Sequence, residues 1–106
     1  MPDYQIISAE DAQVLIGAEA VTILDARDHR SYRAAHIDGA RLLHDDLEQA
    51  LVSEGDFHRP VLLYCYRGID SKAKAERFVE LGFRRVYSLD KGFTAWPRRH
   101  ASPDGT

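Results

Sequence analysis

The sequence contains one cysteine, Cys65, among its 106 residues. A single cysteine excludes an internal disulfide, so its thiol is free. Free thiols are typical of reducing compartments, and we therefore expect a cytoplasmic protein. The amino-terminal stretch Met-Pro-Asp-Tyr-Gln lacks a basic segment followed by an apolar one, so we expect no secretory signal.

Long apolar runs are also lacking, since none approaches the roughly 20 residues that a bilayer-spanning helix needs. We therefore expect no membrane association. The net charge of −3 provides no general attraction for nucleic acid, and we expect no nucleic-acid partner. Local charged stretches, such as Arg98-Arg99-His100, are interpreted as solvated faces.

Internal repeats, low-complexity tracts and linkers are absent as well, which predicts a single domain over residues 1–106. We expect residues 101–106 to form a frayed tail. The rest of the chain alternates strand and helix signals. The predicted strands lie at 4–7, 21–24, 41–43, 61–64 and 85–89, and the predicted helices at 8–17, 28–35, 45–52, 71–81 and 93–98.

The predicted strands are mostly continuous apolar runs rather than alternating ones, as in Val61-Leu62-Leu63-Tyr64. This pattern is typical of an α/β fold whose parallel sheet is covered by helices on both faces. In open sheets of this kind, ligands bind beyond the carboxyl ends of the strands. Asp25, Arg27 and Cys65 follow two such ends, so we expect them at one edge of the sheet.

Cys65 opens a loop between a predicted strand and a predicted helix. Backbone N–H groups of such a loop can form an anion nest, and the helix amino terminus adds partial positive charge. Both effects lower the pKa of a thiol from about 8.5. Arg67 and Lys72 add formal positive charge, and Gly68 permits a sharp turn. The alternative is that Cys65 packs as a small hydrophobe, but its place at a strand end favours a reactive thiol.

Four stretches of the sequence resemble, in order and spacing, the motifs of the rhodaneses, the thiosulfate sulfurtransferases. These are Cys65–Ser71, Ile23–Arg27, His36–Ala40 and Asp90–Trp96. Lys91 stands where that family often has the first glycine of a Gly-Gly pair. The length and the Cys-Tyr-x-Gly start of the loop are most similar to the single-domain type of the bacterial glycerol-3-phosphate operon. The resemblance implies a rhodanese-like, five-stranded parallel sheet flanked by helices on both faces.

The resemblance also implies a reaction. Cys65 would be the catalytic nucleophile, taking sulfane sulfur from thiosulfate or a similar donor as a persulfide and passing it to cyanide, a small thiol or a reduced dithiol protein. No metal or cofactor is implied, and the oligomeric state stays open. The substrate-binding residues implied are Tyr66, Arg67, Gly68, Ile69, Asp70, Ser71 and Lys72.

Asp70 departs from the pattern, because the family commonly has a basic or small hydroxyl-bearing residue there. Its carboxylate could oppose an anionic donor and raise the pKa of the thiol. Alternatively it caps the following helix, which is the interpretation we favour. Asp25, Arg27 and His36 are interpreted as structural support, with Asp25 and Arg27 as a buried pair and His36 as a turn residue bonded to backbone.

The sequence leaves two alternative functions. Phosphatases and arsenate reductases that share this fold need an arginine six positions after the cysteine, where this chain has Ser71. The stronger alternative is a rhodanese-like sulfur carrier or protein-binding module with little thiosulfate turnover.

Overall fold

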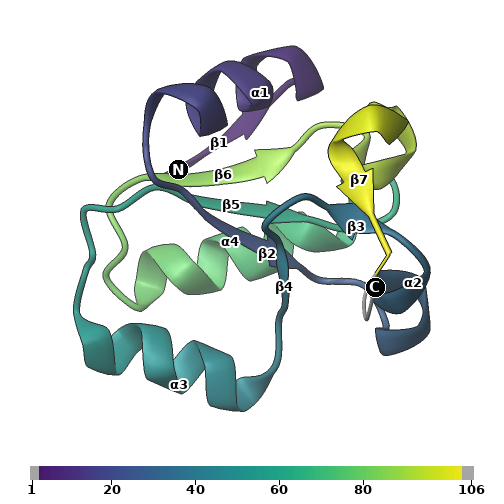
Figure 1. Ribbon diagram of the computed structural model, residues 1–106. Coiled ribbons are helices and arrows are strands. Elements are labelled where there is room, and N and C mark those ends of the chain that lie inside the picture. The colour runs from purple at the N-terminus through teal and green to yellow at the C-terminus, as the bar shows by residue number, and fades with distance from the viewer. Residues whose placement is uncertain (1–2, 104–106) are drawn as a thin grey trace.

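A computed structural model describes residues 3–103 as a five-stranded parallel sheet with helices on both faces (Figure 1). The strand order is β1-β6-β5-β2-β4, and a separate antiparallel pair joins β3 to β7. The elements in chain order are β1 (Tyr4–Ile7), α1 (Ala9–Ala18), β2 (Thr22–Asp25), α2 (His29–Ala34), β3 (His36–Ile37), β4 (Arg41–Leu42), α3 (Asp45–Glu54), β5 (Val61–Tyr64), α4 (Asp70–Glu80), β6 (Val86–Leu89), the 3₁₀ helices η1 (Gly92–Ala95) and η2 (Arg98–His100), and β7 (Ala101–Ser102).

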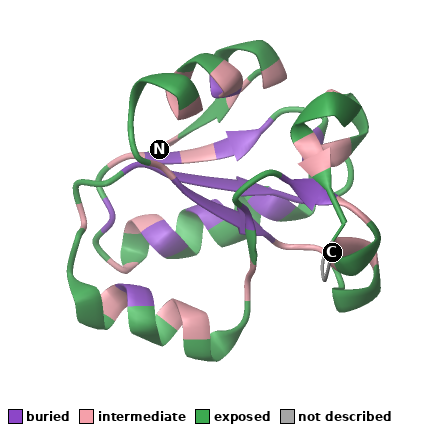
Figure 2. Ribbon diagram, in the orientation of Figure 1, coloured by how far each residue is buried: buried purple, intermediate pink, exposed green. Residues whose placement is uncertain are grey.

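Two apolar clusters, one on each face of the sheet, explain why the central strands read as continuous apolar runs. Leu62 and Tyr64 of β5 pack in a cluster with Ala12 of α1. Val61 and Leu63 of the same strand pack in the other cluster, with residues of α3 and α4. Every residue of β5 is buried, as Figure 2 shows for the centre of the sheet. The predicted α/β fold is therefore confirmed.

Local signals place most helix ends where the sequence predicts them. Ser8 caps α1 by accepting a hydrogen bond from the Asp11 N–H, and Asp28 caps α2 in the same way through Ser31. Gly82, with a φ of 109°, follows the last turn of α4. No helix among residues 3–103 has the length and apolar character that a membrane crossing requires.

Two predictions near the carboxyl end were wrong. The single helix predicted at 93–98 is instead two short 3₁₀ helices, because Trp96 and Pro97 between them are extended. Ala101 and Ser102, expected in a frayed tail, form β7 and pair with β3. Residues 104–106 of that predicted tail lie outside the described residues.

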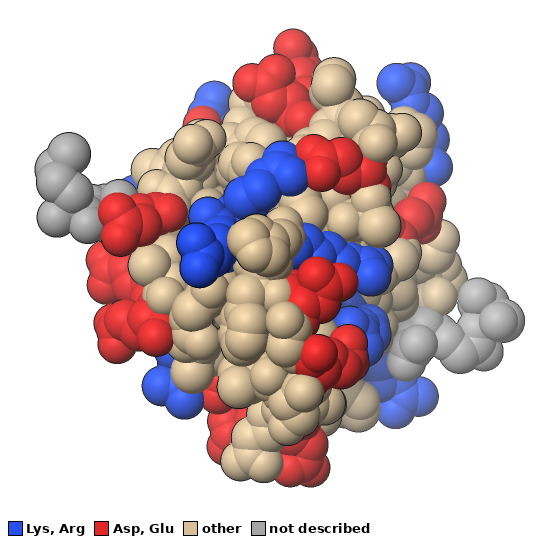
Figure 3. Space-filling view, turned by 90° about the vertical axis from the view of Figure 1, so that its left-hand side faces the viewer, with Lys and Arg blue, Asp and Glu red and all other residues tan. Residues whose placement is uncertain are grey.

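Charged side chains of both signs are interspersed on the face of the molecule drawn in Figure 3. This mixture is what a solvated surface requires. Two bidentate ion pairs lie on the exterior, between Arg77 and Glu48 and between Arg85 and Glu19. Exposed pairs of this kind contribute little to stability.

Candidate active site

The predicted site residues of two strands meet at the carboxyl edge of the sheet. Asp25 ends β2 and is in register with Tyr64, which ends β5 immediately before Cys65. The N–H of Ala26 donates to the Tyr64 carbonyl at 2.8 Å, which continues the pairing of the two segments beyond the end of β2. The structure therefore brings together the segments of Asp25, Arg27 and Cys65, as predicted.

Two glycines allow the cysteine loop to pack closely against the turn that follows β6. Gly68 has a φ of 86°, and a Cβ there would lie 2.8 Å from the Lys91 nitrogen. Gly92 has a φ of 56°, and a Cβ there would lie 2.5 Å from the Cys65 carbonyl oxygen. The N–H of Phe93 donates to that same carbonyl at 2.9 Å. The loop is therefore held by backbone contacts that leave no room for a side chain at either glycine.

The sulfur of Cys65 lies at the focus of this loop, and the residue is only 2% exposed. The N–H of Gly68 donates to Sγ at 3.2 Å and the N–H of Ser71 donates at 3.3 Å. The Ser71 hydroxyl lies 3.4 Å from Sγ. The sulfur is thus surrounded by hydrogen-bond donors, which is the anion nest predicted from the strand–loop–helix order.

These donors determine the ionisation of the thiol. Burial is the largest single influence and raises the pKa of the Cys65 thiol, because it disfavours the charged form. Hydrogen bonds from the Ser71 hydroxyl and from the N–H groups of Ser71, Gly68 and Arg67 act in the opposite direction. Together they outweigh burial, so the pKa of Cys65 lies below its ordinary value. A lowered pKa makes the nucleophilic thiolate available nearer neutral pH.

We expect alkylation of Cys65 by iodoacetamide to show a midpoint below about 8.5, the ordinary pKa of a cysteine thiol. The rate should be measured against pH in the folded protein and in urea, where the midpoint should return to the ordinary value. Equal midpoints in the two states would contradict the donor arrangement around Sγ.

The same shift has a consequence for stability. Because the folded-state pKa is lowered, ionisation of Cys65 stabilises the fold. That contribution is fully present above about pH 8.5, the unfolded value, and is lost as the pH falls through the folded-state pKa. The free energy of unfolding of a Cys65→Ala variant should lack this component of the pH dependence.

The favoured interpretation of Asp70 as a helix cap was wrong. Ile69 occupies the N-cap position of α4, and no side chain makes a capping hydrogen bond there. Asp70 is the first residue of α4, and its side chain is exposed. An acidic residue in the first turn still interacts favourably with the helix dipole, which is a weaker effect than a cap.

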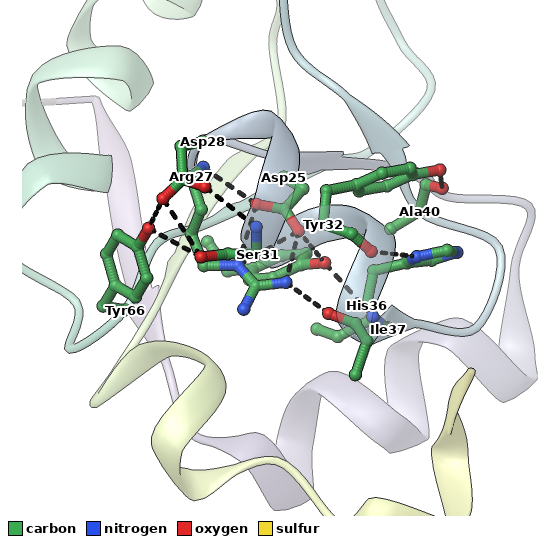
Figure 4. A network of polar contacts seen from close by, with 11 residues as sticks. Asp25, Arg27, Asp28, Ser31, Tyr32, His36, Ile37, Ala40 and Tyr66 are labelled. Carbon is green, nitrogen blue, oxygen red and sulfur yellow. Dashed lines mark hydrogen bonds and ion pairs between the residues drawn. The ribbon is translucent and has the colours of Figure 1, made fainter. Parts of the chain in front are cut away.

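The other loop residues are divided between the interior and the surface. Gly68 and Ser71 are buried with the sulfur, whereas the remaining predicted site residues of the loop are exposed: Tyr66, Arg67, Ile69, Asp70 and Lys72. The hydroxyl of Tyr66 makes a hydrogen bond to Asp28 and lies 2.9 Å from the Ser31 hydroxyl. This side chain therefore joins the cysteine loop to the start of α2 (Figure 4).

A buried ion pair lies beside the loop. The Arg27 guanidinium binds the Asp25 carboxylate through Nε–Oδ1 at 3.1 Å and Nη2–Oδ2 at 2.8 Å. The backbone N–H of Arg27 also donates to Oδ1 at 2.8 Å. The Tyr64 hydroxyl donates to Asp25 Oδ2 at 2.6 Å and accepts from the Ile37 N–H at 3.1 Å. Burial and the Asp25 carboxylate raise the pKa of Tyr64, so its hydroxyl stays protonated.

Aromatic rings enclose the Arg27 guanidinium, whose carbon lies 4.2 Å from the centre of the Phe93 ring. Its Nη2 also donates to the Ala35 carbonyl at 2.6 Å. His36 is stacked on Tyr32 at 4.0 Å, and its Nδ1 lies 2.8 Å from the Tyr32 carbonyl, as Figure 4 shows. The expected bond of His36 to backbone is therefore present, but His36 is the first residue of strand β3 and not a turn residue, so that part of the interpretation was wrong.

Sequence reasoning missed several residues that shape the site. The Tyr64 ring lies against the Arg27 guanidinium, and Gly92 adjoins the cysteine loop. Ser88 of β6 lies behind the loop, with its hydroxyl 2.8 Å from that of Ser71. The glycine of the closing motif is a signal that could have found Gly92, whereas a serine in an apolar strand gives no such signal.

Comparison with known proteins places this geometry in a family. The chain is 40% identical over 93 residues to a thiosulfate sulfurtransferase GlpE of Pseudoalteromonas translucida, covering 88% of this chain and 89% of that protein. It is also 40% identical over 101 residues to the protein of the same name from Coxiella burnetii, covering 95% and 94%.

Solved structures agree with the fold. A rhodanese-like domain protein from Staphylococcus aureus matches with a TM-score of 0.72 at 19% identity, covering 95% of this chain and 94% of that one. A rhodanese-related protein from Thermoplasma volcanium matches with a TM-score of 0.71 at 22% identity, covering 91% and 93%. The family model of the rhodanese-like domain matches residues 8–99 of the sequence. The chain therefore belongs to the rhodanese-like domain family.

Proposed function

We propose that this protein is a thiosulfate sulfurtransferase that carries sulfane sulfur as a persulfide on Cys65. The observation that carries the proposal is the pair of backbone N–H donors, from Gly68 and Ser71, within 3.2–3.3 Å of the buried Sγ, with the Ser71 hydroxyl 3.4 Å away. These donors stabilise a thiolate before the reaction. Relatives that the chain matches over most of its length are named thiosulfate sulfurtransferases.

In the first step, the Cys65 thiolate attacks the outer sulfur of thiosulfate. A bond forms between Sγ and that sulfur, the sulfur–sulfur bond of thiosulfate breaks, and sulfite leaves with the bonding electron pair. Covalent catalysis of this kind divides one transfer into two easier steps. The N–H groups of residues 66–71 stabilise the negative charge of the persulfide, and the exposed cations Arg67 and Lys72 attract the anionic donor.

In the second step, a nucleophilic acceptor attacks the terminal sulfur and Cys65 leaves as the thiolate. Cyanide gives thiocyanate, a small thiol gives a new persulfide, and a reduced dithiol protein gives a persulfide that its second thiol can resolve. No redox cofactor or metal enters either step. Asp25, Arg27 and His36 act as structural support, with Asp25 and Arg27 as a buried ion pair beside the loop.

A phosphatase is the less suitable assignment for this site. The position six residues after Cys65 is Ser71, and its buried hydroxyl lies 3.4 Å from Sγ. Phosphate recognition of the bidentate kind needs a guanidinium at that position.

We also propose that residues 1–106 form one domain and that the protein works in the cytoplasm.

Mass spectrometry after incubation with thiosulfate tests the function directly. We expect a gain of roughly one sulfur mass on the parent protein, no gain on a Cys65→Ser variant, and loss of the adduct when cyanide is added. The release of sulfite should match the adduct in amount. Failure of every sulfane donor to form the adduct would sink the enzyme proposal and leave a protein-binding module.

A further inference from the structure

Behind the reactive sulfur lies a chain of three buried side-chain atoms. Cys65 Sγ lies 3.4 Å from Ser71 Oγ, which in turn lies 2.8 Å from Ser88 Oγ. Cys65 is 2% exposed, Ser71 0% and Ser88 1%. We propose that Ser88 is a positioning residue that orients the Ser71 hydroxyl toward Cys65 and so favours the thiolate. This inference rests on the proposed function for its catalytic meaning, but its geometry is independent of it.

Ser88 has no packing reason to carry a hydroxyl. It lies on β6, in register with Leu63 of β5, and both neighbours within its strand belong to apolar clusters or their edges. A buried hydroxyl costs free energy unless it makes a hydrogen bond. Within residues 3–103, Ser71 Oγ is the one hydrogen-bond partner that Ser88 Oγ has. The Ser88 hydroxyl therefore depends on the active-site loop for its hydrogen bond.

The number of hydrogens on these three side-chain atoms favours ionisation of the Cys65 thiol. With a neutral thiol, the three atoms carry three hydrogens but share only two contacts, so one hydrogen has no acceptor among these three atoms. With a thiolate there are two hydrogens for two contacts. Ser88 donates to Ser71, and Ser71 donates to the sulfur. Loss of the thiol proton thus removes the unmatched hydrogen, and each bond in such a chain strengthens the next.

The same orientation suits the whole reaction cycle. Sγ carries no hydrogen as a thiolate, and none once it is bonded to a second sulfur in the persulfide. Ser71 can therefore donate to Sγ in both states without any rearrangement of Ser88. The pair of hydroxyls would hold the sulfur in place while it gains and loses its sulfur atom, and no proton has to move through the chain.

The test is a double-mutant cycle on the pH profile of iodoacetamide alkylation of Cys65, a readout that needs no sulfur transfer. We expect S88A to raise the midpoint by about 0.5 units, which is roughly a threefold slower reaction below the midpoint. S71A should raise it by about one unit, because the hydroxyl donor itself is lost. The double variant should match S71A, because Ser88 acts through Ser71.

Two further variants keep the result interpretable. S88T retains the hydroxyl and should restore the parent midpoint. T22V removes another buried strand hydroxyl, at the start of β2 and far from the carboxyl edge of the sheet, and should leave the midpoint unchanged. A parent-like midpoint in S88A, or an S88A shift of the same size with and without Ser71, would overturn the proposal. If the parent forms no persulfide but the coupling is present, the proposed function fails and this inference stands.

Discussion

Replacing Gly92 with alanine is expected to reduce sulfur transfer by about 100-fold, because the new methyl group displaces the loop that carries Cys65. The added Cβ would lie 2.5 Å from the Cys65 carbonyl oxygen and 2.7 Å from the carbonyl of Tyr66. Both contacts are with backbone, so no side-chain rotation relieves them. The hydrogen bonds from Phe93 and Thr94 to these two carbonyls must lengthen, and the donors around Sγ move with the loop.

Two other glycines supply matched controls for this substitution. Gly39 has a φ of 85°, and nothing lies within 4 Å of the place that a Cβ would take, so G39A tests backbone strain alone. It should cost about 1–2 kcal/mol without changing the reactivity of Cys65. Gly17 is exposed within α1 and has open space around it, so G17A should stabilise the helix by about 0.5–1 kcal/mol. Persulfide formation and iodoacetamide reactivity should be measured for all three. Parent-like rates in G92A would contradict the steric argument.

The position of the site could be predicted from the sequence because the decisive signals are local. A continuous apolar run followed by cysteine, glycine and a helical pattern is enough to place Cys65 at the end of a buried parallel strand. The prediction that Asp25 and Arg27 lie at the same edge required only that their strand be parallel to that of Cys65. Both inferences follow from the order of elements and need no knowledge of side-chain packing.

The features that were missed depend on contacts between distant segments. The two-residue strands β3 and β7 are too short to show any pattern, so the order of Ala101 and Ser102 could not be seen. Ser88 gains its meaning from the packing of α4 against β6, which places its hydroxyl beside Ser71. Asp70 failed as a predicted cap because α4 begins one residue earlier than predicted, which makes Ile69 the N-cap.

In the buried pair of Asp25 and Arg27, an Asp25→Asn substitution should cost about 3–5 kcal/mol of stability. The arginine side chain is only 5% exposed and would retain its charge without a counterion. The amide would also present an N–H₂ group toward donors from Arg27 and Tyr64 that now meet carboxylate oxygens. For a domain of about 100 residues, this loss corresponds to a fall in Tm of more than roughly 10 °C.

Urea unfolding followed by circular dichroism, with two comparison variants, separates burial from charge pairing. Glu19→Gln breaks an equally bidentate pair with Arg85 on the surface, and its effect should be far smaller because water solvates both partners. In the double variant D25N/R27M the uncompensated buried charge is gone, so part of the stability lost in D25N should return. A D25N protein as stable as E19Q would mean that the pair does not secure the carboxyl ends of β2 and β5. A double variant less stable than D25N would mean that Arg27 stabilises the site through Phe93 and the Ala35 carbonyl rather than through its carboxylate partner.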